Sequence, residues 1–200
     1  MIIALISPCP GCGKSTVAKY LTQNTPTLPS PLLIPLAAPL KRMLAALLED
    51  FGIGQADIRR YINGDWKEKP ILEIPGTPTA RHLMQTLGTE WGRNLIHEDL
   101  WVQAWKRKAV RAQVVVVDDV RFLSEYNALP DAKVWRITNK KALKTYRESL
   151  PRTFWHRLLR ITPKHGHASE GELNSAPVNA EIANDGTLDE LYAKIDELLK

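Results

Sequence analysis

The feature that most constrains the fold of this chain is its first sixteen residues. Residues 2–6 read IIALI, the continuous apolar run typical of a strand that is buried on both faces. A loop rich in proline and glycine follows and ends in GKST at residues 13–16, and a helix is predicted near residues 15–21. A strand, a glycine loop and a helix in this order predict an α/β fold with a loop that binds phosphate groups.

The residue types in this loop suit that chemistry. Gly11 and Gly13 allow backbone amides to fold around a phosphate, and the helix N-terminus adds free N–H groups and partial positive charge. Lys14 is expected to reach the β- and γ-phosphates, and the Ser15 hydroxyl to bind magnesium. The predicted phosphate-binding residues are Gly11, Cys12, Gly13, Lys14, Ser15 and Thr16. The loop departs from the GxxxxGK[ST] pattern at Pro8, where the first glycine normally stands.

Two weaker interpretations of the loop stay open. One is a glycine-rich turn with a surface lysine. The other is a CxxC redox pair formed by Cys9 and Cys12, the only cysteines of the chain. Two cysteines this close cannot build a disulfide framework or a four-cysteine zinc site, so we expect them to be loop residues without a catalytic role.

A second strand supplies carboxylates. Residues 114–117 are four valines, and Asp118 and Asp119 follow directly. Because ligands bind beyond the carboxyl ends of strands in open α/β sheets, these aspartates are candidates for the magnesium site together with Ser15. The sequence does not choose between the two aspartates, and a solvated pair is the alternative.

The remaining elements alternate between helix and strand. Periodicity and chain breakers predict short strands at 32–36, 133–138 and 181–183, and helices at 40–51, 56–62, 79–87, 98–111, 121–129 and 187–199. Residues 25–39 carry five prolines and should be mostly extended, while residues 140–160 should form a helix and a mobile basic segment. This order predicts one α/β layered domain with a mainly parallel sheet covered by helices on both faces.

Composition excludes several classes of protein. The chain has 200 residues, of which 44% are hydrophobic and 24% charged, so neither disorder nor a fibrous repeat is expected. It has neither an apolar run long enough to span a bilayer nor a basic leader, which predicts a cytoplasmic protein without a membrane partner. Residues 140–164 carry eight basic side chains against one glutamate, which favours an anionic partner, either nucleotide phosphate or nucleic acid.

Missing motifs narrow the function further. A GTPase switch would place DxxG after the valine strand, but residues 118–122 read DDVRF, and residues 139–142 read NKKA instead of NKxD. A helicase motor would need further motifs. Small P-loop kinases remain, and these need arginines for phosphate groups; Arg81, Arg93 and Arg121 are candidates.

Residues 79–93 are dense in groups that can bind an acceptor nucleotide. Trp91 can stack on a base, and Gln85 or Glu90 can hydrogen-bond to the edge of one. Each has a structural alternative, since a tryptophan here can be a core residue and a glutamate a helix-surface charge.

These motifs together resemble the bacteriophage deoxynucleoside monophosphate kinases, a family of the P-loop nucleotide kinase superfamily. The resemblance spans nearly the whole chain. It rests on GKST at 13–16, KEKPI at 67–71, Arg81 with QTLGTEWGR at 85–93, DLWV at 99–102, DDVRF at 118–122 with Glu125, HASE at 167–170 and IANDGTL at 182–188. The resemblance implies a three-layer P-loop kinase fold with an acceptor-binding lobe near 38–111 and a mobile basic lid near 140–168.

The activity implied by the resemblance is transfer of the γ-phosphoryl of ATP, with Mg²⁺, to a deoxynucleoside 5′-monophosphate, giving the diphosphate and ADP. The implied catalytic residues are Lys14, Asp118, Arg121, Arg152 and Arg157. The implied acceptor-binding residues are Arg81, Gln85, Glu90, Trp91, Arg93, His167 and Glu170. Asn184 and Gly186 are expected in the loop against which adenine packs. A phage-encoded enzyme would work in the cytoplasm of the host cell, on precursors of phage DNA.

Three alternatives stay open beside this one. A related kinase would act on a modified base within phage DNA and use the basic segment to hold the backbone. A non-catalytic nucleic-acid-binding protein would keep a vestigial nucleotide site. A metal site at His165, His167 and Glu170 is the weakest, and the sequence leaves homodimerisation and the accepted bases undecided.

Overall fold

The computed structural model describes residues 1–149 and 173–200. The chain divides into two compact units. The sheet unit comprises Met1–Pro35 and Ala109–Lys200, and the helical unit comprises Leu36–Lys108.

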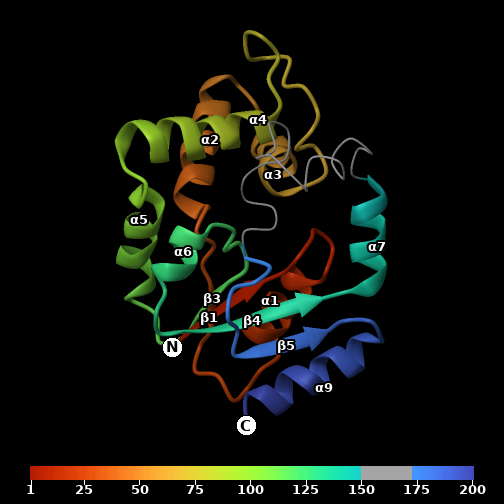
Figure 1. Ribbon diagram of the computed structural model, residues 1–200. Helices are drawn as coiled ribbons and strands as arrows, with labels where there is room; N and C mark the ends of the chain where they lie inside the picture. The colour runs from red at the N-terminus through yellow and green to blue at the C-terminus, as the bar shows by residue number, and fades with distance from the viewer. Residues whose placement is uncertain (150–172) are drawn as a thin grey trace, which may run out of the picture. The chain divides into compact units, whose positions relative to one another are not determined.

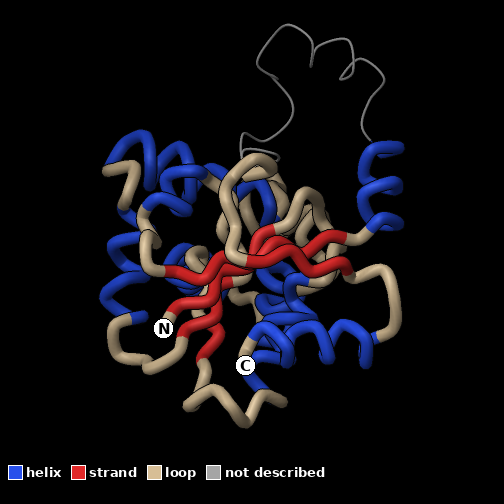
Figure 2. Tube along the Cα trace, turned by 60° about the horizontal axis from the view of Figure 1, so that its bottom comes forward, coloured by secondary structure: helices blue, strands red, loops and turns tan. Residues whose placement is uncertain are grey.

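The sheet unit is built on a five-stranded parallel sheet (Figures 1 and 2). Its strands are β1 (Ile2–Ile6), β2 (Leu32–Leu33), β3 (Val115–Val117), β4 (Ala132–Thr138) and β5 (Ala180–Ala183). The order across the sheet is β2-β3-β1-β4-β5, and every neighbouring pair is parallel. All carboxyl ends therefore lie at one edge, with β1 in the centre between β3 and β4. The α/β class with a parallel sheet flanked by helices is confirmed.

Helices α1 (Lys14–Gln23) and α9 (Leu188–Leu198) pack against each other and against the sheet. The core between them takes alternate residues along a strand, such as Ile3 and Leu5 of β1 or Trp135 and Ile137 of β4, because successive side chains of a strand point to opposite faces. Tyr20 and Tyr192 stack with ring centroids 4.0 Å apart at the margin of this core. Helices α6 (Leu123–Asn127) and α7 (Lys140–Ser149) follow β3 and β4.

The helical unit has its own core. It contains α2 (Ala38–Asp50), α3 (Gln55–Asn63), α4 (Ala80–Gln85), the π-helical continuation η1 (Thr86–Ile96) and α5 (Leu100–Ala109), whose last residue falls in the sheet unit. The buried residues of this core cluster are Leu44, Leu48, Ile53, Ile58, Tyr61, Ile62, Ile71, Ile74 and Ala80. The isoleucines and leucines that the sequence places at helical spacing thus pack together.

Two elements differ from the prediction. The strand expected at 32–36 is limited to Leu32–Leu33. The N–H of Ile34 still donates to the carbonyl of Val116 at 3.0 Å, but Pro35 lacks the N–H that would continue the ladder. The helix expected to end at Leu87 continues through η1 to Ile96. Glycines disfavour helices, but a Cβ on Gly92 would lie 2.5 Å from Nε1 of Trp101, so this glycine admits the indole and packing outweighs propensity.

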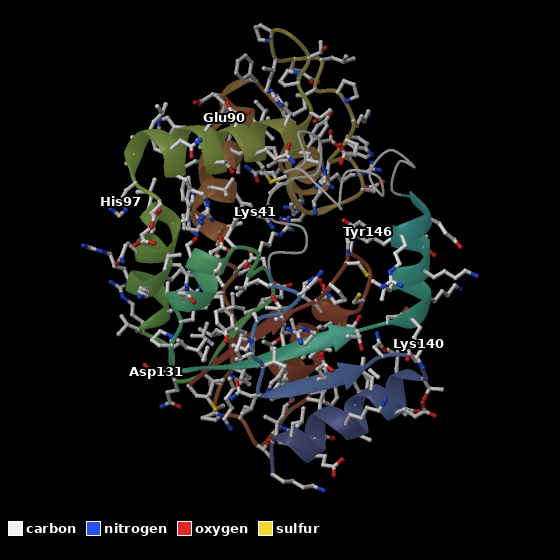
Figure 3. The ribbon with its side chains drawn as sticks, in the orientation of Figure 1. Lys41, Glu90, His97, Asp131, Lys140 and Tyr146 are labelled. Atoms are coloured by element: carbon white, nitrogen blue, oxygen red, sulfur yellow. The ribbon has the colours of Figure 1, made fainter. Side chains whose placement is uncertain are left out.

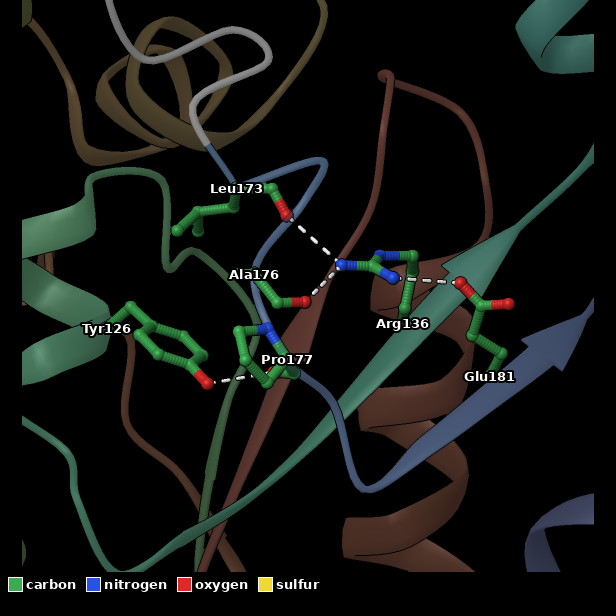
Figure 4. A network of polar contacts seen from close by, with 6 residues as sticks. All are labelled: Tyr126, Arg136, Leu173, Ala176, Pro177 and Glu181. Carbon is green, nitrogen blue, oxygen red and sulfur yellow. Dashed lines mark hydrogen bonds and ion pairs between the residues drawn. The ribbon is translucent and has the colours of Figure 1, made fainter.

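Arg136 of β4 fixes the segment that leads into β5 (Figure 4). Its Nη2 donates to the carbonyls of Leu173 at 3.2 Å and Ala176 at 2.6 Å, and its Nη1 pairs with the Glu181 carboxylate at 2.9 Å. Tyr126 of α6 adds a hydrogen bond from its hydroxyl to the carbonyl of Pro177, at 2.8 Å. One guanidinium therefore holds both the start of this segment and the strand after it.

Helix α7 accounts for the first part of the predicted basic helix. The rest of the expected lid, with Arg152, Arg157, His167 and Glu170, lies outside the described residues. None of the helices within 1–149 and 173–200 combines the length and the hydrophobicity needed to cross a membrane.

Candidate nucleotide-binding site

The loop between β1 and α1 adopts the backbone that its glycines allow. Gly11 and Gly13 have φ angles of 80° and 104°, in the left-handed region that side chains rarely occupy. Gly13 is the N-cap of α1, and the first turn of this helix carries neither a side-chain cap from that position nor an acidic residue. The N–H groups and partial positive charge of the helix start are therefore available to an anion.

Lys14 is held inside the loop. Its Nζ donates to Oγ of Ser7, whose hydroxyl in turn donates to the carbonyl of Cys9 at 2.8 Å. Burial lowers the pKa of Lys14 below its ordinary value, and the positive charge of Arg121 lowers it further, while Asp118 acts in the opposite direction. The side chains of Lys14, Arg121 and Asp118 thus share one electrostatic environment. Ser7, which sequence reasoning did not single out, positions the lysine.

The end of β3 lies beside the phosphate loop. Val117 pairs with Ala4 of the central strand, so Asp118 emerges about one strand spacing, roughly 4.8 Å, from β1. Asp118 and Asp119 are half-buried, and Arg121 is exposed. The buried Glu125 carboxylate accepts hydrogen bonds from the backbone N–H groups of Arg121 at 2.7 Å and Phe122 at 3.1 Å. Glu125 therefore fixes the turn that presents Asp118 and Arg121.

The two cysteines form a buried pair within the loop. Their Sγ atoms are 3.0 Å apart, and both side chains are buried. Burial, followed by the hydrogen bond to Cys12, raises the pKa of the Cys9 thiol to about 12, against the opposing charges of Lys14 and Arg147. A thiol protonated at neutral pH is a poor nucleophile, which favours a loop role over a redox pair.

The carboxyl ends of β4 and β5 contribute asparagines. Asn139 follows β4 and Asn184 follows β5, and the Nδ2 group of Asn139 donates to the carbonyl of Asn184. The Asn184 side chain donates to the carbonyl of Cys12 at 3.0 Å. Asn184, expected at the adenine, is therefore engaged with the phosphate loop. Beside it, a Cβ on Gly186 would overlap the Glu190 carboxylate, which accepts from the N–H of Thr187 at 3.3 Å.

Helix α7 presents one face to the phosphate loop. A Cβ on Gly11 would lie 3.7 Å from Cβ of Ala142. Tyr146 is one turn further along the same face, half-buried, and Figure 3 shows it on the side of α7 toward the loop. The influence of Arg147 on the Cys9 thiol places its charge near the loop as well. Sequence reasoning counted Arg147 only as part of the basic segment.

The donor set of the site fits magnesium. Ser15 is exposed at the start of α1, and Asp118 emerges from the adjacent strand, so the chain offers the hard oxygen ligands that Mg²⁺ prefers. Within the described residues, no cluster of three or more histidine, cysteine, aspartate or glutamate side chains forms a metal cage. A site of one or two protein oxygens suits an ion whose other ligands are phosphates and water.

The predicted acceptor-binding residues of the helical unit lie along α4 and η1. Arg81 is paired with Glu68, Gln85 and Arg93 are half-buried, and Glu90 and Trp91 are exposed (Figure 3 labels Glu90). The neighbouring Trp101 is buried, and its Nε1 donates to the carbonyl of Gly88 at 2.8 Å. Trp101 is therefore the core tryptophan of this region, whereas the ring of Trp91 is partly exposed.

No protein-family model matches the sequence, and no curated protein matches it. Among solved structures, TT1252 from Thermus thermophilus is 15% identical with a TM-score of 0.49, over 100% of this chain and 96% of that one. A plasmid partition protein from Borrelia burgdorferi is 17% identical with a TM-score of 0.42, over 98% and 96% of the chains. Another from Borrelia burgdorferi B31, bound to AMPPNP, is 18% identical with a TM-score of 0.39, over 100% and 90%. Similarity at this level carries neither an activity nor a substrate to this chain.

The fold and the loop define the class. A parallel sheet with its central strand running into a glycine loop, and a helix that begins at the loop lysine, form a P-loop nucleotide-binding fold.

Proposed function

We propose that this protein is a kinase that transfers the γ-phosphoryl group of ATP to a deoxynucleoside 5′-monophosphate. The observation that carries the proposal is that β3 ends beside β1, so that Asp118 and the turn with Arg121 follow next to the loop that holds Lys14. Phosphoryl transfer needs little covalent participation by the protein, and its rate comes from positioning and charge neutralisation. Two cations beside one carboxylate provide that neutralisation.

The roles of the residues follow from their placement. The N–H groups of the loop and of the start of α1 bind phosphate oxygens, and Lys14, held by Ser7, places its charge at the transferring group. Arg121, in the turn fixed by Glu125, stabilises the charge that spreads over the γ-phosphate. Ser15 and Asp118 would hold Mg²⁺, which would neutralise part of the phosphate charge when bound.

The acceptor is proposed from the sequence resemblance. It assigns the monophosphate to Arg81, Gln85, Glu90, Trp91 and Arg93 of the helical unit, and the exposed ring of Trp91 is consistent with stacking on a base.

The test is to measure ADP and deoxynucleoside diphosphate formation from ATP and Mg²⁺ with each deoxynucleoside monophosphate. Ribonucleotides and duplex DNA serve as comparison acceptors. Turnover with one or more free deoxynucleotides is expected, together with a loss of about 100-fold or more in Lys14→Ala. The control is Lys19→Ala, which removes the same charge from an exposed position on the same helix.

Other products would contradict the proposal in distinct ways. Label transferred to DNA would favour a kinase for modified DNA bases. ADP release that is independent of any acceptor would indicate an ATPase. DNA binding without turnover would favour the non-catalytic alternative.

A further inference from the structure

Asn184 makes a contact that nucleotide chemistry alone does not require. It follows β5, and its Nδ2 donates to the carbonyl of Cys12, 172 residues away in the sequence and inside the phosphate loop. A Cβ on Gly13 would overlap this same amide group. The glycine before the loop lysine therefore admits the asparagine as well as adopting a positive φ angle.

Asn184 is itself held on both sides. Its backbone N–H donates to the carbonyl of Thr138 at 2.8 Å, and its carbonyl accepts from Nδ2 of Asn139. Oδ1 of Asn139 in turn accepts from the N–H of Ala142 at 2.7 Å, in the first turn of α7. A continuous series of hydrogen bonds thus runs from α7 through the ends of β4 and β5 to the phosphate loop.

The consequence for the loop follows from peptide geometry. In a planar trans peptide, the carbonyl of one residue and the N–H of the next point in opposite directions. Holding the Cys12 carbonyl at Asn184 therefore turns the N–H of Gly13 away from Asn184. An N–H that is oriented before the ligand arrives needs no reorganisation when the phosphate binds.

We propose that Asn184 is a positioning residue that orients the Cys12–Gly13 peptide for phosphate binding, and that Asn139 holds Asn184 in place. This inference rests on the proposed function only in that the loop binds the phosphates of a nucleoside triphosphate. It differs from the expectation that Asn184 packs against adenine, because a residue that orients the loop acts equally on any ligand with the same phosphates.

The test compares ATP with inorganic tripolyphosphate, each with Mg²⁺, by titration calorimetry. Asn184→Leu keeps the approximate size of the side chain, cannot donate and adds no charge near the anionic ligand. Asn139→Ser keeps a hydroxyl acceptor for the N–H of Ala142 and loses the Nδ2 donor that reaches Asn184. Asn127→Leu makes the same neutral change at an exposed position of α6 and is the control.

Asn184→Leu should weaken ATP and tripolyphosphate by the same factor, roughly tenfold or more, and Asn139→Ser should weaken both by a smaller common factor. Asn127→Leu should bind both ligands like the wild type. Loss of ATP affinity with tripolyphosphate unchanged would overturn the proposal and return Asn184 to the adenine. Unchanged affinity for both would also overturn it. A wild-type protein that binds neither ligand would instead overturn the proposed function, and the positioning role with it.

A second measurement needs no ligand. The Cys12 thiol is 1% exposed, and its backbone carbonyl is the atom that Asn184 holds, so release of the loop should expose it to N-ethylmaleimide. Mass spectrometry should find faster alkylation of Cys12 in Asn184→Leu and Asn139→Ser than in the wild type and in Asn127→Leu, with the thermal unfolding midpoint nearly unchanged. Equal alkylation rates in all four proteins would show that the asparagines do not hold the loop.

Discussion

The phosphate-loop edge of the sheet unit and the α4–η1 helix of the helical unit gather functional residues in different ways. At the sheet edge, side chains from four separate segments converge, because parallel strands end together and β1 lies between β3 and β4. Along α4 and η1, residues 81–93 are spread over roughly 18 Å of one continuous helix. A sheet edge brings residues that are distant in the sequence to one place, whereas a helix spaces neighbouring residues along its axis. The roles of residues at the sheet edge are therefore easier to assign, because several of them can contact one ligand.

The largest expected changes in the free energy of unfolding test whether each region is stabilised by its own hydrophobic core. Leu21→Ala in the sheet unit and Leu48→Ala in the helical unit each remove a side chain that is 0% exposed. Each should lower the free energy of unfolding by about 3 kcal/mol, measured by urea denaturation, because each leaves a cavity. Leu188→Ala, at a position that is 56% exposed, should change it by less than about 0.5 kcal/mol.

The division between the regions also predicts binding. Folded Leu48→Ala should bind an ATP analogue like the wild type, since the loop packs on the core of the sheet unit. A large loss of affinity in this variant would contradict the separation.

Arg121→Gln tests the convergence at the sheet edge. Turnover should fall about 100-fold, because an oriented cation at the transferring phosphate is lost. Arg121 disfavours the protonated form of Lys14, so its removal raises the pKa of Lys14. The alkaline limb of ATP-analogue binding should therefore move to higher pH, as measured by titration across the alkaline range. Arg111→Gln removes the same charge from another exposed position of the sheet unit and should leave the limb in place.

Substitutions of two tryptophans test which residues of the helical unit bind the acceptor nucleotide. Trp91 is 38% exposed and Trp101 is 4% exposed. Trp91→Leu should raise KM for the acceptor nucleotide about tenfold, because it removes a stacking surface. It should lower the melting temperature less than Trp101→Leu does, because Trp91 is the more exposed of the two rings. Trp101→Leu should lower the melting temperature, because the Gly88 carbonyl loses its donor. A Trp91 variant with lowered stability and unchanged KM would return this residue to a structural role.

The smallest effect is expected at the Arg136 network. Glu181→Gln should reduce the free energy of unfolding by no more than about 0.5 kcal/mol, because Glu181 is largely exposed and Arg136 keeps two carbonyl acceptors. Asp131→Asn, at an exposed position before β4, is the control for the lost charge. A loss above about 1.5 kcal/mol would mean that the ion pair, and not the carbonyl contacts, fixes the segment before β5.

Local pattern determined much of this protein. Three local patterns predict β1, the loop, α1 and β3: the apolar run at 2–6, the glycines of the loop and the valines before Asp118. A continuous apolar run is typical of a buried strand, and glycine is the residue that most readily adopts a positive φ angle, so both can be recognised in a short stretch of sequence. The same reasoning missed the continuation of the helix through Gly88 and Gly92. Packing against Trp101 offsets their low helix propensity there, and no local window contains that contact.

Tertiary structure alone decided how the site is assembled. The sequence places Asp118 after a strand, but only the strand order puts that strand beside β1. The hydrogen bond of Lys14 to Ser7 and that of Asn184 to Cys12 depend on side chains that meet after folding. Periodicity describes which face of an element is buried, whereas the partner of a polar group is chosen by long-range packing. Lys14 and Asn184 could therefore be named from the sequence, while their partners Ser7 and Asn139 could not.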